Sequence, residues 1–264
     1  SRWETAKTKQ AFAFLRIDLS PVPRRRAEIR NRVDEPTQVA HANRRSYVTS
    51  ENSNQVLVLD AFTNTAVDQV VLKCSLSDCH HLGIAANPVR PEVYVTVSDL
   101  DQVLVIDTTL NQEVHQFTVG DYPADCVVSD DGSMMYVSLQ REDKIAVVDL
   151  SIPMRVYRIG VGKQPAGLVL SPNGNLLYVA CTRSNSISVI DVRTQNRIMD
   201  ITVGHAPNVV AMAKNGRYIY VINTLSDDLS IIDMATHNEV IRLRIGIAPI
   251  GVSIRRELNG RELA

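Results

Sequence analysis

Residues 178–191 read YVACTRSNSISVID, and nearly the same pattern returns forty-two residues away in both directions. Residues 136–149 read YVSLQREDKIAVVD, and residues 220–233 read YVINTLSDDLSIID. Each segment has two runs rich in β-branched residues around a polar turn, and each ends on an aspartate. Because β-branched residues favour strands, the segment predicts a strand, a turn and a second strand. This unit repeats at a fixed interval.

The interval holds for several residue types along the chain. The tyrosines that open the segment are Tyr47, Tyr94, Tyr136, Tyr178 and Tyr220. The aspartates that close it are Asp60, Asp107, Asp149, Asp191 and Asp233. Both series have spacings of 47, 42, 42 and 42 residues. Prolines and glycines keep the same step of 42, at Pro123, Pro165, Pro207 and Pro249 and at Gly120, Gly162, Gly204 and Gly246. Agreement of four residue types predicts a repeat architecture.

Each unit divides into four short strands. In the unit around residue 180 they are AGLVL, LLYVA, ISVID and RIMDITV. Asn-Gly and Asp-Gly pairs such as Asn173-Gly174 fit a tight hairpin between the first two strands. The second turn carries Asn54, Asp101, Asp143, Asn185 and Asp227, whose side chains we expect to bond their own turn backbone and to tolerate the left-handed conformation. We expect the closing aspartates to do the same at the third turn. Four-stranded units of about 42 residues predict an all-β fold, the β-propeller.

These residues also resemble a known family. The segments YVTS at 47–50, YVTV at 94–97 and YVIN at 220–223, each followed by a V-x-V-I-D-like strand and a V-G-x-x-P link, resemble the YVTN family of β-propeller repeats, of WD40-like architecture. The resemblance covers roughly residues 34–254. It implies a binding protein at the cell surface, in an S-layer or in the periplasm; one periplasmic branch is associated with DNA. Related propellers include lactonases and cytochrome-fused oxidoreductases.

The two ends of the chain predict how the ring closes. Residues 34–249 give five full units, and Asp18 lies 42 residues before Asp60, with FLRID at 14–18 matching VLVLD at 56–60. Residues 1–33 then supply the later strands of a closing blade, and residues 250–264 supply its first strand. We therefore expect a single domain of six blades. The segment WETAKT is poor in apolar residues for a second strand, so a fragment of a seven- or eight-bladed parent stays open.

Composition excludes some function classes. The formal charge is −1 and the pI is about 6.6, so the chain as a whole has no attraction for nucleic acid or anionic membrane. No apolar run reaches the roughly 18–20 residues that span a bilayer. An arginine cluster could meet a nucleic-acid backbone, but charges on an exposed outer strand also prevent edge pairing, and nucleic acid is not the partner we expect. Its members are Arg24, Arg25, Arg26, Arg30 and Arg32. The N-terminus lacks Met and an apolar signal core, so we expect that a targeting segment has been removed.

The default binding surface of a propeller is its channel and the face where the links between blades and the second turns open. The candidate ligand-binding residues there are Gln38, His41, Asp121, Tyr122, Asp125, Lys163, His205 and Asn208. Asp125 stands where Gly83, Gly167 and Gly251 stand in other units, as a ligand or metal contact or as part of a solvated channel mouth. A metal-dependent lactonase would need several inward carboxylates, and only this one is clear.

One link contains KCSLSDCHH, residues 73–81, and accounts for the single spacing of 47. His81 takes the place of the proline. Three interpretations compete: a Cys74–Cys79 disulfide or thiol pair; a zinc or copper site of Cys74, Cys79, His80 and His81; and covalent haem c, since C-S-L-S-D-C-H resembles a rarer spacing of the C-x-x-C-H signal. We expect the first, and therefore no cofactor. Cys126 and Cys181 fall within strands and are expected to be buried, inert thiols.

The sequence shows no Ser-His-Asp order, Gly-rich phosphate loop or HExxH motif. It therefore favours a non-catalytic binding or scaffold propeller outside the cytoplasm, with a protein or another cell-envelope component as partner. Two alternatives stay open. One is a redox or metal-carrying propeller that uses Cys74–His81, and the other is a lactonase-like hydrolase that uses the channel around Asp125.

Overall fold

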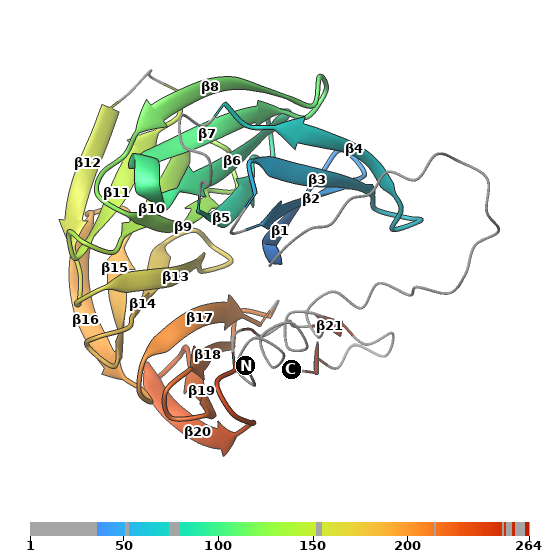
Figure 1. The fold of residues 1–264 in the computed structure, drawn as a ribbon. Coiled ribbons are helices and arrows are strands. Elements are labelled where there is room, and N and C mark those ends of the chain that lie inside the picture. The colour runs from blue at the N-terminus through green and yellow to red at the C-terminus, as the bar shows by residue number, and fades with distance from the viewer. Residues whose placement is uncertain are drawn as a thin grey trace, which may run out of the picture.

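The computed structural model describes residues 36–50, 53–73, 80–151, 155–213, 215–249, 251, 255–256 and 262–263. These residues form five four-stranded antiparallel sheets, each with its strands in chain order from one edge to the other. Figure 1 shows the sheets arranged around a common centre, with the first strand of each sheet inside and the fourth outside. Contacts between the first strands of successive sheets join one sheet to the next. The predicted all-β propeller fold is confirmed.

The strands follow the repeat. The first blade comprises β1 (Pro36–Ala42), β2 (Arg45–Ser50), β3 (Gln55–Asp60) and β4 (Ala66–Val71). The second comprises β5 (His81–Ala86), β6 (Glu92–Val97), β7 (Gln102–Asp107) and β8 (Gln112–Thr118), with a 3₁₀ turn at Ser98–Leu100. The third comprises β9 (Pro123–Val128), β10 (Met134–Leu139), β11 (Lys144–Asp149) and β12 (Arg155–Gly160). The fourth comprises β13 (Pro165–Leu170), β14 (Leu176–Cys181), β15 (Ser186–Asp191) and β16 (Asn196–Thr202). The fifth comprises β17 (Pro207–Met212), β18 (Tyr218–Asn223), β19 (Asp228–Asp233) and β20 (Asn238–Arg244).

The number of blades in the complete ring stays a prediction. The later strands of the expected closing blade fall in residues 1–33, which lie outside the described residues. Near the C-terminus, β21 (Arg255–Arg256) pairs with β22 (Glu262–Leu263).

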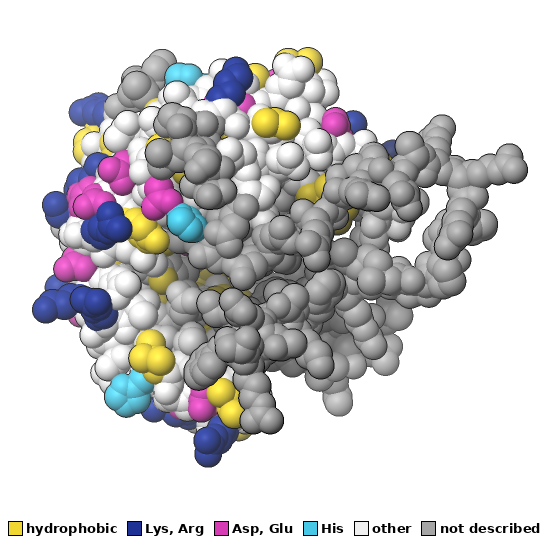
Figure 2. Space-filling model, viewed as in Figure 1, with side chains coloured by type: hydrophobic (Ala, Val, Ile, Leu, Met, Phe, Trp, Pro, Cys, Tyr) yellow, Lys and Arg dark blue, Asp and Glu magenta, His cyan; other side chains and the backbone are white. Residues whose placement is uncertain are grey.

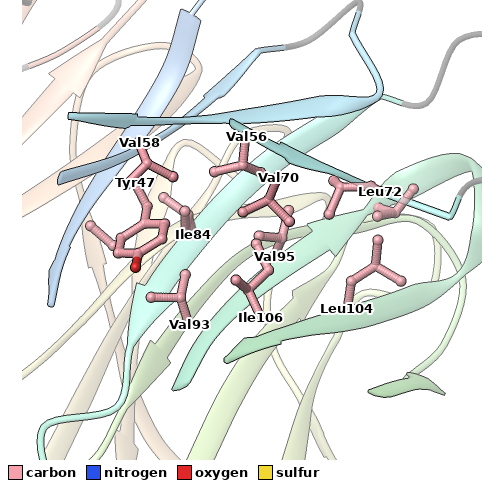
Figure 3. Close-up of a cluster of buried hydrophobic side chains, with 12 residues drawn as sticks. Tyr47, Val56, Val58, Val70, Leu72, Ile84, Val93, Val95, Leu104 and Ile106 are labelled. Atoms are coloured by element: carbon pink, nitrogen blue, oxygen red, sulfur yellow. The ribbon is translucent and has the colours of Figure 1, made fainter. Parts of the chain in front are cut away.

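The core lies between the blades. Each blade has a tyrosine face, the side of its sheet that carries the opening tyrosine, and in the first four blades this face packs on the next blade. Figure 3 shows the first such junction, where Tyr47, Val58 and Val70 of the first blade meet Val95 and Ile106 of the second. Side chains alternate along a strand, so one sheet buries an apolar row on each side. Each buried aliphatic side chain contributes about 1.5–3 kcal/mol, which explains the abundance of valine and isoleucine.

The first and third turns have the predicted chemistry. Gly132, Gly174 and Gly216 have φ between 68° and 69°, a conformation that glycine adopts without cost, and they complete the hairpins between the first two strands. The closing aspartates cap the third turn: Asp191 Oδ1 accepts the Thr194 N–H at 2.7 Å. The equivalent oxygens of Asp60, Asp107, Asp149 and Asp233 accept N–H groups two or three residues later in the same way.

The second turn differs from the prediction in one respect. Asp101, Asp143, Asn185 and Asp227 have φ between 53° and 59°, as expected for Asx residues. Their side chains, however, do not bond their own turn. Asp143 Oδ1 accepts the N–H of Gln164 at 2.8 Å, in the link that leads out of the same blade. The ring brings the two loops together, so that the side chain bonds the neighbouring link instead of its own turn.

Candidate functional site

The Asp125 carboxylate accepts hydrogen bonds from the inner strands of three blades. Its Oδ1 accepts a hydrogen bond from Gln38 Nε2 of β1 at 3.1 Å and from the Cys126 N–H at 2.9 Å. Its Oδ2 accepts the Leu168 N–H of β13 at 3.3 Å. Gln38 Oε1 in turn accepts the Ile84 N–H of β5 at 3.1 Å. The carboxylate therefore links the third blade to the first and the fourth, Gln38 extends the link to the second, and both carboxylate oxygens have partners.

The environment of Asp125 makes its charge costly. Burial raises the pKa of this carboxyl to about 6, because the loss of water outweighs the hydrogen bonds from Gln38, Cys126 and Leu168. The shift is modest because each of those donors favours the ionised form. Asp125 thus fits a structural tie between blades, and nothing in the described residues adds a second carboxylate beside it.

The glycines aligned with Asp125 have no room for a side chain. An ideal Cβ on Gly83 would lie 2.7 Å from the Cα of Asp125, and one on Gly167 would lie 2.6 Å from the carbonyl oxygen of Asn208. Crowding of the inner strands therefore explains these glycines. Asn208 itself is exposed on β17. His41 lies near the opposite end of β1, where its Nδ1 is 2.9 Å from the Ser46 hydroxyl.

The links and the second turns meet at one end of the sheets and form what we call the link face. It consists of the links 119–122, 161–164, 203–206 and 245–248 and the second turns 98–101, 139–143, 181–185 and 223–227. The opposite end, formed by the first and third turns, is the hairpin face. Figure 2 shows one side of the molecule, on which acidic and basic side chains are interspersed without separating into large fields. On the side shown, any preference for a charged partner therefore comes from local groups.

In the third blade the charges on the link face are paired. Arg141 lies 3.4 Å from the Asp121 carboxylate, and its guanidinium carbon lies 4.3 Å from the centroid of the Tyr122 ring. The Asp121 N–H donates to Glu142 at 2.9 Å. The two predicted residues Asp121 and Tyr122 therefore share one contact, Arg141, which the sequence analysis did not select.

In the fourth blade the equivalent positions carry two cations. Lys163 and Arg183 are both exposed, and the Arg183 N–H donates to the Lys163 carbonyl at 3.2 Å. The Lys163 N–H donates to the Ser184 hydroxyl at 2.7 Å. Neither cationic side chain has an ion-pair or hydrogen-bond partner within the part of the chain that the structure describes. In the fifth blade the same pair of positions is His205 and Leu225, both exposed.

The cysteine segment is described only at its two ends, Lys73 and His80–His81. Cys74 and Cys79 lie outside the described residues, so the disulfide, metal and haem interpretations stay predictions. Nδ1 of the His80 ring lies against the Asp99 carboxylate of the neighbouring second turn, within hydrogen-bond reach. β5 begins at His81 and pairs it with Val97, just as β9 begins at Pro123 and pairs it with Leu139, so the register at His81 is as expected. Nothing is described of the His81 side chain.

The other two cysteines behave as predicted. Cys126 and Cys181 are free and buried. Burial raises the pKa of both thiols, which keeps them protonated and unreactive. Across the described ranges, no group of three or more His, Cys, Asp or Glu side chains is arranged to hold a metal ion, and no helix there is long and apolar enough to cross a bilayer.

Sequence reasoning missed Arg141 and Arg183. Both lie in the link-face turn that follows the second strand, five residues after Tyr136 and Tyr178. The register of the repeat could have indicated these arginines, because it places the second turn beside the link that carries the predicted residues Asp121 and Lys163. Reading the two loops as one surface would have found them.

The chain belongs to the YNCE-like β-propeller family, whose model matches residues 17–257. Among solved structures, a hydrazine synthase of Kuenenia stuttgartiensis is 25% identical with a TM-score of 0.60, over 62% of this chain and 49% of that chain. The chain thus spans about half the length of that protein. A functionally unknown protein from Desulfotomaculum acetoxidans DSM 771 is 11% identical with a TM-score of 0.66, over 82% of this chain and 74% of that one, and shows the fold alone. No curated protein sequence matches.

Proposed function

We propose that this chain is a non-catalytic binding propeller that docks an acidic segment of a protein partner on its link face. The observation that carries the proposal is the pair Lys163 and Arg183. At the equivalent place in the third blade a cation and an anion neutralise each other, 3.4 Å apart. In the fourth blade the two positions carry cations, and neither forms an ion pair with an anion of the described residues. A carboxylate supplied by a partner would be attracted by both.

The backbone of this site is already ordered. The Gln164 N–H is held by Asp143, the Lys163 N–H by Ser184 and the Thr182 N–H by the Gln164 carbonyl. A partner therefore orders only the two long side chains when it binds. Pre-organisation of this kind lowers the entropic cost of association. At the same positions of the fifth blade, the exposed His205 and Leu225 offer a polar and an apolar contact to a longer partner segment.

The channel supports the same proposal by another argument. Both oxygens of Asp125 are engaged in bonds between blades, so its carboxylate fits a structural role better than hydrolysis. The location outside the cytoplasm is part of the proposal and rests on the resemblance to surface and periplasmic repeats. Fractionation of the native host, with detection of this chain in the envelope or the cytoplasm, tests it.

Charge reversal tests the docking site. The probe is a fluorescein-labelled decaglutamate peptide, and its affinity is measured by fluorescence anisotropy at two salt concentrations. We expect Lys163→Glu combined with Arg183→Glu to weaken binding at least about tenfold at low salt, because two attractive contacts become repulsive. We also expect binding to weaken as salt rises.

The matched control reverses two exposed arginines of the hairpin face. Arg44→Glu combined with Arg217→Glu changes the net charge equally, and both arginines stack on neighbouring rings rather than pairing with acids. We expect this control to change the affinity less than about threefold, through the general field alone. Equal loss in the two double variants would show that the peptide senses only net charge and would overturn the proposal.

A further inference from the structure

A cavity of about 360 Å³ opens on the hairpin face, at the junction of the second and third blades. Its apolar wall is formed by Val105 and Phe117 of the second blade and by Val148 and Leu150 of the third. The volume lies within the roughly 300–1,000 Å³ that small-molecule sites occupy in proteins. The cavity lies at the end of the sheets opposite the link face, so a ligand in it is independent of the proposed docking site.

At two other junctions a side chain of the next blade reaches the opening tyrosine. At the first junction, Asn111 Oδ1 of the second blade accepts the Tyr47 hydroxyl at 2.9 Å. The same oxygen accepts Arg45 at 2.7 Å. At the fourth junction His237, the equivalent residue of its third turn, stacks on Tyr178 with ring centroids 6.3 Å apart. The third turn of the following blade thus supplies a contact to the tyrosine in both places.

The second junction is arranged differently. The Tyr94 hydroxyl bonds within its own blade: it donates to Glu92 at 2.5 Å and accepts from Asn87 Nδ2 at 3.2 Å. Its hydrogen bonds therefore need no side chain of the third blade, and the space beside it is the cavity. Asn87 Nδ2 also donates to the Gly132 carbonyl at 3.1 Å, across the junction. The two blades that form the cavity are thus tied to each other before any ligand binds.

The polar end of the cavity carries charges of both signs. Arg90 Nη1 donates to the Leu150 carbonyl at 2.9 Å, across the junction, and this bond holds the guanidinium in place. A Glu92 carboxylate oxygen lies 3.9 Å from the same nitrogen, which is too far for a hydrogen bond. Because a guanidinium has five N–H donors and a carboxylate has two acceptor oxygens, both groups can still bind a ligand. Asp149 adds a second carboxylate to the lining, and its Oδ1 caps its own turn.

We propose that this cavity binds an α-amino acid with an apolar side chain. The ligand carboxylate pairs with Arg90, and its ammonium group pairs with Glu92. Because these two groups lie 3.9 Å apart, one small molecule that carries both charges reaches both of them. The ligand side chain then packs on the apolar wall at Phe117 and Val148. A ligand with a single charge leaves one of the two groups without a new partner, and a purely apolar ligand leaves both.

Isothermal titration calorimetry of the full chain with L-phenylalanine tests the ligand class. Three analogues each lack one feature: phenethylamine has no carboxylate, hydrocinnamate has no ammonium group, and L-alanine has no large apolar side chain. We expect L-phenylalanine to bind at least about tenfold more tightly than each analogue, because each analogue loses one of the three contacts. Phenethylamine or hydrocinnamate binding as tightly as L-phenylalanine would overturn the proposal, and so would the absence of L-phenylalanine binding up to its solubility.

A matched pair of variants locates the binding. Glu92→Gln removes the partner of the ammonium group but keeps an acceptor for the Tyr94 hydroxyl, and we expect it to weaken L-phenylalanine binding at least about tenfold. The control Glu239→Gln changes the net charge equally on β20, where Glu239 pairs with Arg242 at 2.9 Å, and should change the affinity less than about twofold. Equal losses in the two variants would place the ligand elsewhere and overturn the proposal. Thermal unfolding of both variants without ligand establishes that they fold.

Discussion

The link face and the hairpin face use the same residue types in different ways. On the hairpin face, a closing aspartate such as Asp191 bonds an N–H group only three residues later. On the link face, Asp143 bonds the N–H of a residue twenty-one positions later in another loop. In the fourth blade the bonds described on the hairpin face stay within one blade, whereas the link from the third blade to the fourth is bonded to a turn of each of them. Between the second and third blades the hairpin face also has a bond across the junction, from Asn87 Nδ2 to the Gly132 carbonyl at 3.1 Å. A link that is bonded to both blades holds its side chains in fixed relative positions, which is what a docking site requires.

Substitutions at two glycines of the fourth blade, Gly162 and Gly174, should show the largest difference between the faces. An ideal Cβ on Gly162, in the link, would lie 2.8 Å from the Cβ of Cys181 and 2.9 Å from the Ser184 hydroxyl. We expect Gly162→Ala to lower the free energy of unfolding by about 3 kcal/mol, because neighbouring loops must move apart. Urea unfolding measures it.

Gly174→Ala on the hairpin face is the matched substitution. Nothing lies within 4 Å of an ideal Cβ there, and the only cost is a left-handed φ of 69°. We expect a loss of about 1 kcal/mol. A larger loss at Gly174 than at Gly162 would show that the link face is no more tightly connected than the turns opposite.

Removal of the capping carboxylates should give a smaller contrast. Asp143→Ala leaves the Gln164 N–H without its acceptor and puts alanine at a φ of 56°, so we expect a loss of about 1–2 kcal/mol. Asp191→Ala opens only an exposed local turn, and its effect on thermal unfolding should be smaller. If the two variants unfold at the same temperature, the long-range bond contributes nothing beyond a local cap.

The stability of the protein should depend on pH in opposite directions through Asp125 in the channel and Asp107 on the hairpin face. The pKa of Asp125 is raised by burial to about 6, so its favourable contribution is present below about pH 4 and is lost as pH rises through 6. We expect Asp125→Asn to remove about 1 kcal/mol of this dependence, since solvent reaches the half-buried group. Unfolding measured between pH 4 and 7 checks it.

Asp107 should behave in the opposite sense. Hydrogen bonds from Leu110 and Thr109 lower the pKa of its carboxyl, so its contribution is present above about pH 4 and is lost as pH falls below that value. Asp107→Asn should remove a dependence on the acid side only. A loss of stability toward neutral pH through Asp107 would contradict the hydrogen-bonded cap.

Much of this molecule could be predicted from its sequence, because the repeat fixes local structure. The spacing of Tyr136 and Asp149 predicted two strands and their turn, and Gly174 predicted the hairpin. The bond from Asp143 to Gln164 could not be predicted, since it depends on how the ring places two loops. The bond from Gln38 to Asp125 crosses eighty-seven residues and has no local signal. Side-chain partners between blades follow from closure geometry, which a repeat pattern does not contain.

Hydrogen–deuterium exchange with and without the decaglutamate peptide tests the docking site most directly. Peptides that cover residues 161–164 and 182–185 of the link face are compared with peptides that cover 171–175 and 191–196 of the hairpin face in the same blade. We predict that the peptide slows exchange in the first pair and leaves the second unchanged, and that Lys163→Glu with Arg183→Glu abolishes the effect. Slower exchange on the hairpin face, or none on either face at saturating peptide, would contradict a docking site at Lys163 and Arg183.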